Sequence, residues 1–189
     1  MGVELKDYIC HYDDVVSTDF CTHVVKAFEL DTHNHDVVDR QKRPSFTQLN
    51  VSAQYLKRRE RWIEIQTKIQ EVFVKYIDKY IDEKSLGPDF PSKYAFEEYR
   101  IKRYSEGVDE FRDHVDVGDH SSARRFLVCF LYLNDVESGG QTDFPLLDYS
   151  VTPKAGRLLI FPPLWLYRHA GRPVNSGKKY IIGSYLHYL

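Results

Sequence analysis

The stretch that decides the fold reads RFLVCFLYLNDVESGGQTDFPLLDYSVTPKAGRLLIF, residues 125–161. It contains two short apolar runs, 125–133 and 156–161, separated by turn-forming Asn, Asp, Gly and Pro. Comparable runs lie on either side, at residues 95–104, 165–169 and 179–188. Several short strands separated by turns are typical of a sandwich or barrel. We therefore expect residues 94–189 to form a β-barrel core.

The first half of the chain has a different pattern, and residues 1–93 are expected to form a helical support region. Residues 8–12 suit a short strand, and Ser17 or Thr18 can cap a helix with apolar residues every four positions. Residues 31–44 look like a polar loop. Residues 53–82 carry apolar side chains at three- and four-residue steps, which predicts a long amphipathic helix. No linker divides the chain, so we expect a single domain, 1–189, of class α+β, mainly β, with N-terminal helices packed on one sheet.

Composition excludes several classes of protein. The chain has 189 residues and a formal net charge of −2, so no global basic field points to nucleic acid or membrane surfaces. No apolar run approaches the roughly 20 residues of a membrane helix. The three cysteines form no CxxC pair, and residues 1–10 lack the apolar core of a signal peptide. These features predict a cytoplasmic protein and leave its oligomeric state open.

A metal site is indicated by His114-Val115-Asp116. Side chains two apart on a strand share a face, so an imidazole and a carboxylate can converge on one cation. His169 follows another apolar run and offers a third ligand. Two histidines and one carboxylate leave coordination positions open, as in non-haem Fe(II) oxygenases, whereas a structural zinc site has four protein ligands. An isolated HxD triplet is usually a surface polar pair, so the neighbouring sequence has to decide.

A lysine at a fixed distance from His169 strengthens that interpretation. Lys179 stands ten positions after His169 and begins an apolar strand. A buried cation is unfavourable without an anionic partner. A dicarboxylate such as 2-oxoglutarate supplies one, since its keto-acid end can chelate iron while its far carboxylate meets Lys179. Strand alternation then turns Lys178 toward solvent.

Several motifs in this order resemble the prolyl 4-hydroxylase family of 2-oxoglutarate oxygenases over about residues 94–189. They are Tyr104-Ser105-Glu106-Gly107, Phe111, His114-Val115-Asp116, Phe130-Leu131-Tyr132-Leu133-Asn134, Gly139-Gly140-Gln141-Thr142, Phe144, Pro153, Gly156-Arg157, Phe161, His169, Gly171, Pro173-Val174, Gly177 and Lys179. The resemblance implies a double-stranded β-helix, or jelly-roll, barrel. It implies Fe(II) on His114, Asp116 and His169, with the far carboxylate of 2-oxoglutarate on Lys179. It also implies a hydrogen bond from Tyr132 to that carboxylate, and Tyr104 close to the cosubstrate or substrate.

The activity implied by the resemblance is that of an Fe(II)- and 2-oxoglutarate-dependent dioxygenase. Such an enzyme uses O₂, is supported by ascorbate, and needs no catalytic side chain beyond the metal site. The leading expectation is hydroxylation of a C–H bond of a prolyl residue in a peptide or protein. Two alternatives stay open: the same chemistry on a nucleic acid or free small molecule, and a non-catalytic barrel domain. The nucleic-acid demethylases carry an arginine-rich pattern after the distal histidine, which Gly171-Arg172-Pro173-Val174 does not match.

Other polar and aromatic residues have two interpretations each. Arg125 either contacts substrate or cosubstrate or forms an ion pair at the barrel rim. Trp165 either lines the mouth near His169 or packs in the core. His120 and the pair His33 and His35 are expected on solvated loops. Residues 38–48 are either an active-site lid or a mobile loop.

Overall fold

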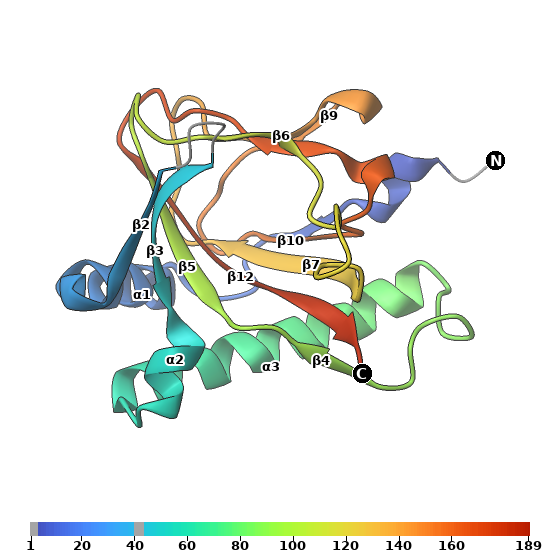
Figure 1. The fold of residues 1–189 in the computed structure, drawn as a ribbon, viewed down its shortest axis with the longest axis horizontal. Helices are drawn as coiled ribbons and strands as arrows, with labels where there is room; N and C mark the ends of the chain where they lie inside the picture. The colour runs from blue at the N-terminus through green and yellow to red at the C-terminus, as the bar shows by residue number, and fades with distance from the viewer. Residues whose placement is uncertain (1–3, 40–43) are drawn as a thin grey trace.

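The computed structural model describes residues 4–39 and 44–189, and it arranges them in three layers: a small sheet, a large sheet and a layer of helices (Figure 1). The eight-stranded sheet has the order β1-β10-β7-β12-β5-β3-β2, with β4 also paired to β12. Its strands are β1 (Cys10–Tyr12), β2 (His35–Asp39), β3 (Ser45–Asn50), β4 (Tyr94–Phe96), β5 (Arg100–Ser105), β7 (Arg125–Tyr132), β10 (Leu158–Phe161) and β12 (Lys178–Tyr188).

The four-stranded sheet has the order β6-β11-β8-β9 and lies on the other side of the large sheet from the helices (Figure 1). Its strands are β6 (Phe111–His114), β8 (Thr142–Phe144), β9 (Tyr149–Val151) and β11 (His169–Gly171). All pairings in both sheets are antiparallel. This mainly β, jelly-roll architecture confirms the predicted fold class.

Strand β12 sends alternate side chains to the two faces of the large sheet. Tyr180, Ile182 and Leu186 lie in the apolar core shared with the helices. Lys179 and Ile181, which alternate with them, face the space between the two sheets. Because a strand sends successive side chains to opposite faces, one apolar segment serves both the structural core and the interior cavity.

The helices cover the outer face of the large sheet. They are α1 (Thr18–Leu30), α2 (Val51–Leu56) and α3 (Glu60–Glu83). The Ser17 side chain caps α1 by accepting a hydrogen bond from the Phe20 backbone N–H, as the sequence predicts. The apolar face of α3, including Ile65, Ile69 and Phe73, is fully buried in the shared core. Short 3-10 turns complete the chain at Leu5–Tyr8, Thr32–Asn34, Pro145–Leu147 and Trp165–Tyr167.

The single helix predicted over residues 53–82 is wrong, because the structure has two. Asn50 accepts a hydrogen bond from the Ala53 backbone N–H and so starts α2 early. Arg58, between α2 and α3, has a φ of 58°. A left-handed residue interrupts the helical hydrogen-bond ladder, so the chain turns and α3 begins at Glu60.

Three further boundaries differ from the prediction. Residues 1–93 are not a purely helical support region, because β2 and β3 join the large sheet there, together with β1, which confirms the short strand predicted at residues 8–12. The expected loop at 31–44 contains β2, whose edge position lets a polar segment pair with β3. Where a strand is expected at residues 165–169, Trp165–Tyr167 form a 3-10 turn, and β11 begins only at His169. Among the described residues, no helix is long and apolar enough to cross a membrane.

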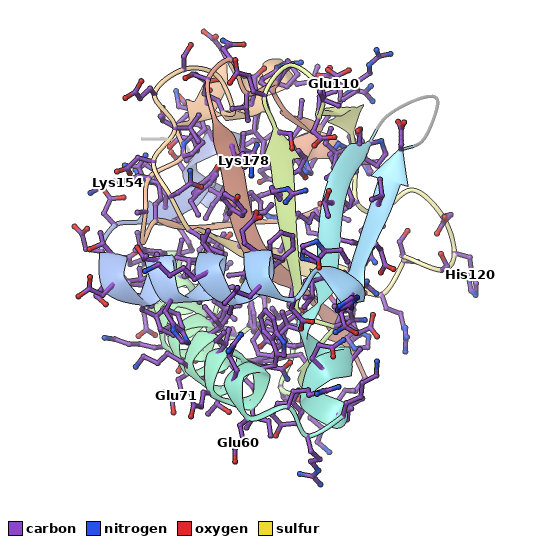
Figure 2. The ribbon with its side chains drawn as sticks, turned by 90° about the vertical axis from the view of Figure 1, so that its left-hand side faces the viewer. Glu60, Glu71, Glu110, His120, Lys154 and Lys178 are labelled. Atoms are coloured by element: carbon purple, nitrogen blue, oxygen red, sulfur yellow. The ribbon has the colours of Figure 1, made fainter. Side chains whose placement is uncertain are left out.

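We expect Ile69→Ala, in the middle of α3, to lower the free energy of unfolding by about 2–5 kcal/mol, since Ile69 is fully buried and truncation leaves a cavity. Urea denaturation followed by circular dichroism measures the change. Glu71→Ala is the matched control on the same helix, at an exposed side chain (Figure 2), and should shift stability by less than about 0.5 kcal/mol. Equal effects of the two substitutions would contradict the burial of this face of α3.

Candidate metal centre and its two cavities

Two paired strands bring the predicted metal ligands together. In the β6–β11 ladder His114 stands directly opposite His169. Asp116 follows two residues after the end of β6. Its carboxylate lies 3.5 Å from the Nε2 atom of each histidine, through Oδ1 to His114 and Oδ2 to His169. Among the described residues, these three form the one cluster of His, Cys, Asp and Glu able to hold a metal ion.

The two imidazoles are oriented by backbone carbonyls. His114 Nδ1 lies 2.7 Å from the Arg112 carbonyl oxygen, and His169 Nδ1 lies 3.0 Å from that of Tyr167. With the proton on Nδ1 donated to these carbonyls, each Nε2 keeps its lone pair for a metal. Burial lowers the pKa of His169 to about 4, so this imidazole is neutral at physiological pH. Phe111 stacks on His114 with ring centroids 3.5 Å apart and restrains that ring further.

The Asp116 carboxylate is the least satisfied group in the centre. Its Oδ1 accepts a hydrogen bond of 2.8 Å from the Tyr185 hydroxyl. Its Oδ2 is buried and has no hydrogen-bond partner among the described residues. Burial by itself raises the pKa of Asp116, but His169, His114 and Tyr185 outweigh it and the pKa is lowered overall. The group is therefore an anion inside the protein.

These residues fit a divalent metal ion. A buried carboxylate oxygen without a partner costs free energy, and a cation among the three side chains removes that cost. Ligands of one ion at about 2.1 Å from it lie roughly 3 Å apart, and the ligand atoms here lie within 4.8 Å of one another. One carboxylate and two imidazoles match the donor set of non-haem iron sites.

Tyr185, Arg125 and Glu97 form a group of contacting side chains that supports Asp116 from behind, and we call this group the brace. The sequence interpretation missed it. The Arg125 guanidinium lies 4.1 Å from the Tyr185 ring centroid and donates a 3.1 Å hydrogen bond to the Asp116 carbonyl oxygen. Glu97 holds Arg125 through two hydrogen bonds of 2.8 Å. Arg125 therefore forms an ion pair at the barrel rim, which is one of its two predicted roles. It also lines the outer cavity described below. Alternation along β12 from Lys179 would have pointed to Tyr185.

A small inner cavity of about 60 Å³ connects the metal centre to Lys179. Lys179 is 2% exposed, and its Nζ donates a 2.8 Å hydrogen bond to the Gly140 carbonyl oxygen. It also lies 4.5 Å from the centroid of the Tyr104 ring, so both predicted residues line this cavity. Burial lowers the pKa of Lys179 to about 7. No carboxylate among the described residues forms a salt bridge with Lys179. A buried cation without an anionic partner in the protein is suited to bind an anionic ligand.

Tyr132 takes a different place from the one expected. It is fully buried, but it is not among the residues that line the inner cavity. Its hydroxyl donates a 2.7 Å hydrogen bond to Thr142 Oγ1, and Thr142 lines the cavity instead. The structure therefore places Tyr132 behind Thr142, which sequence reasoning missed even though Thr142 belongs to the Gly139–Thr142 motif.

A wider outer cavity of about 800 Å³ opens on the other side of the centre. The β2–β3 hairpin forms one wall through Val38, Pro44, Phe46 and Gln48. The predicted lid, residues 38–48, is therefore partly a paired hairpin rather than a loop, and its central residues 40–43 lie outside the described part of the chain.

The remaining predicted residues lie away from the centre. Trp165 is 69% exposed on a 3-10 turn and lines neither cavity, so the core interpretation is wrong and no contact supports a substrate role. His120 is exposed at the end of a loop that projects from the sheets (Figure 2), and Lys178 faces solvent, as predicted. His35 stacks on Phe28 and contacts its carbonyl oxygen, with no role at the metal centre.

Comparison with known proteins agrees with this geometry. The sequence model of the 2OG-Fe(II) oxygenase superfamily matches residues 99–187, which include all three candidate ligands and Lys179. A putative prolyl 4-hydroxylase of Acanthamoeba polyphaga mimivirus is 41% identical over 66 residues, covering 31% of this chain and 27% of that protein. The human prolyl 4-hydroxylase subunit alpha-1 is 28% identical over 107 residues, covering 48% and 20%. The matches thus span less than a third of these curated relatives.

Solved structures show the same fold. The viral collagen prolyl hydroxylase of Paramecium Bursaria Chlorella virus-1, solved with 2OG, superimposes with a TM-score of 0.72 at 23% identity, over 96% of this chain and 97% of that one. A Trichoplax adhaerens prolyl hydroxylase, in complex with a hypoxia inducible factor peptide fragment, gives a TM-score of 0.72 at 16% identity over 95% and 83%. The chain thus has the fold of these prolyl hydroxylases, and its residues 99–187 match the sequence model of the 2OG-Fe(II) oxygenase superfamily.

Removing the Tyr185 hydroxyl tests the brace behind Asp116. We expect Tyr185→Phe to weaken Fe(II) binding roughly tenfold or more, because groups that orient metal ligands contribute on that scale. Anaerobic titration with Fe(II) measures the affinity without relying on turnover. Tyr188→Phe, at a half-exposed tyrosine on the same strand, is the control and should leave the affinity unchanged. If Tyr185→Phe binds Fe(II) like the parent protein, the hydroxyl does not position Asp116.

Proposed function

We propose that this chain is an Fe(II)- and 2-oxoglutarate-dependent dioxygenase that hydroxylates a C–H bond, most favourably that of a prolyl residue in a peptide or protein. The observation that carries the proposal is the buried Asp116 carboxylate between two imidazoles, with the buried amine of Lys179 at the end of an adjoining cavity. A metal ion would satisfy the Asp116 carboxylate, and a dicarboxylate would supply an anionic partner for Lys179.

The residues have distinct roles in this proposal. His114, Asp116 and His169 would hold Fe(II), and Lys179 would bind the far carboxylate of 2-oxoglutarate, with Tyr104 and Thr142 lining its cavity. When bound, the iron with 2-oxoglutarate and O₂ supplies the oxidising chemistry for an unactivated C–H bond. The chain supplies orientation and an enclosed cavity that limits access of water. No side chain is needed as a general base or nucleophile.

The outer cavity supports a peptide or protein substrate. Its volume of about 800 Å³ is large enough for several residues, and the β2–β3 hairpin gives it an elongated wall. The relatives whose names and titles mention collagen or a hypoxia inducible factor peptide favour the same class of substrate. Ascorbate as a supporting reductant and a cytoplasmic location remain part of the proposal.

Two other functions fit the cavity less well. A nucleic acid would require several unpaired cations along its backbone path. Of the three described cations that line the outer cavity, Arg125 and Arg100 are each paired with a glutamate, which leaves Lys102 alone unpaired. A buried carboxylate oxygen without a hydrogen-bond partner, as in Asp116, lowers the stability of the fold unless a cation binds it. A non-catalytic barrel would gain nothing that offsets this cost.

The proposal is tested by incubating the protein with Fe(II), 2-oxoglutarate, O₂, ascorbate and a panel of proline-containing peptides. Mass spectrometry should detect a gain of one oxygen atom, together with succinate. His114→Ala and Asp116→Ala should both abolish the two products, because either change removes a ligand. His120→Ala is the matched control at an exposed loop histidine and should retain them. Succinate production that survives in Asp116→Ala would refute the ligand assignment.

Lys179 should act on the cosubstrate and not on the metal. We expect Lys179→Met to raise the KM for 2-oxoglutarate about tenfold or more, because a charge-assisted bond to a carboxylate is lost. Anaerobic calorimetry should show weaker 2-oxoglutarate binding, with Fe(II) affinity retained. Lys178→Met removes the same charge from the solvent side of β12 and should change neither quantity. Loss of the metal in Lys179→Met would show that the residue has been misassigned.

A further inference from the structure

One of the described cations that line the outer cavity, Lys102, forms no salt bridge with a carboxylate. Among the described residues that line it, Arg125 is paired with Glu97 and Arg100 with Glu98. Lys102 lines the same cavity and forms no salt bridge within the described part of the chain. Its ammonium lies 4.8 Å from the ring centroid of Phe46 and 5.7 Å from that of Phe111. The Lys102 side chain is half-buried, and burial lowers the pKa of its ammonium.

Lys102 stands at the boundary between the two cavities. Along β5, alternate residues face the interior in order of depth: Arg100 lines the outer cavity, Lys102 lines both, and Tyr104 lines the inner one. Phe46, the closer aromatic partner of the Lys102 ammonium, lines only the outer cavity. The Lys102 ammonium thus lies where the two cavities meet, whereas Lys179 lines only the inner cavity.

A structural role does not account for this lysine. Arg103, its neighbour on the opposite face of β5, is a structural cation, and it is neutralised by an ion pair with Glu29. An apolar residue at position 102 would pack on Phe46 and Phe111 without the desolvation cost of an ammonium. The charge itself therefore needs an explanation.

Counting formal charges shows what the complete site would lack. Fe(II) and Asp116 leave one positive charge, and 2-oxoglutarate with its two carboxylates is balanced by that charge and Lys179. Within the described residues, Lys102 then remains as one uncompensated cation, because Arg100 and Arg125 are paired with glutamates. A substrate carrying a carboxylate restores neutrality, and a substrate carrying a cation is disfavoured.

We propose that Lys102 is a specificity-determining residue that binds a carboxylate of the substrate, so that the preferred peptide presents an acidic group close to the C–H bond that is oxidised. The inference rests on the proposed function, because it assigns the outer cavity to a peptide. The carboxylate comes from a Glu or Asp side chain or from a peptide C-terminus, and the experiment distinguishes these sources.

The test measures peptide binding to the anaerobic protein loaded with Fe(II) and 2-oxoglutarate, and then oxidation of the same peptides in air. Capped peptides with a single proline carry Glu, Gln or Lys in turn at each of the three positions on either side. A second set has a free C-terminal carboxylate, and a third has alanine in place of proline. Binding is measured by fluorescence anisotropy, oxidation by mass spectrometry, and 2-oxoglutarate affinity by calorimetry for every variant.

We expect the parent protein to bind a Glu peptide, or a free C-terminus at a fixed distance from proline, about tenfold more tightly than its neutral counterpart. Lys102→Met and Lys102→Gln should both lose this preference while keeping their affinity for 2-oxoglutarate. Lys102→Glu should favour the Lys peptide at the same position. Lys178→Met, on the solvent face, should behave like the parent protein, which separates a local contact from a change in net charge.

Three results would overturn the inference: no preference for a carboxylate in the parent protein, a preference that persists in both neutral variants, or a loss of 2-oxoglutarate affinity in place of peptide selectivity. Failure of the proposed function looks different. If the Lys102-dependent preference appears in binding, including with the proline-free peptides, but no peptide gains oxygen, Lys102 recognises a carboxylate and the prolyl oxidation is wrong.

Discussion

The structure of the centre depends on one buried carboxylate, Asp116. An ionised acid loses much of its hydration when it is buried, and such a loss is tolerated only where positive or hydrogen-bonding groups surround it. The His114 imidazole and the Tyr185 hydroxyl lie against Oδ1 of this carboxylate and the His169 imidazole against Oδ2, yet Oδ2 has no hydrogen-bond partner within the described residues. The fold thus holds an incomplete electrostatic arrangement, which a divalent cation would complete.

Rigid neighbours hold this arrangement in place. The β6–β11 ladder fixes His114 opposite His169, and backbone carbonyls orient both rings. Behind them β12 contributes Tyr185 on its interior face, while its other face is held by the helical core. The stability of the helical layer and the geometry of the centre are therefore linked through a single strand. A substitution in the core can disturb the centre without touching it.

Charge is distributed by depth in the interior. Lys179 lies at the end of the inner cavity, Lys102 at the boundary, and the paired residues Arg100 and Arg125 toward the outside. With this order, each anionic group of the cosubstrate and of the proposed substrate has its own cation. Binding of the cosubstrate and selection of the substrate therefore depend on different lysines, which an activity measurement alone does not distinguish.

The sequence by itself determined the strand-rich class, the three candidate ligands and Lys179, because these depend on local alternation and on motif order along the chain. It did not determine the break at Arg58, the pairing of β2 with β3, or the place of Tyr132 behind Thr142. Those features depend on which distant segments pack together, as does the contact of Tyr185 with Asp116 across 69 positions. Spacing along a chain gives the face of a strand, but only tertiary packing decides which side chain stands in front of another and which cation is left without a partner.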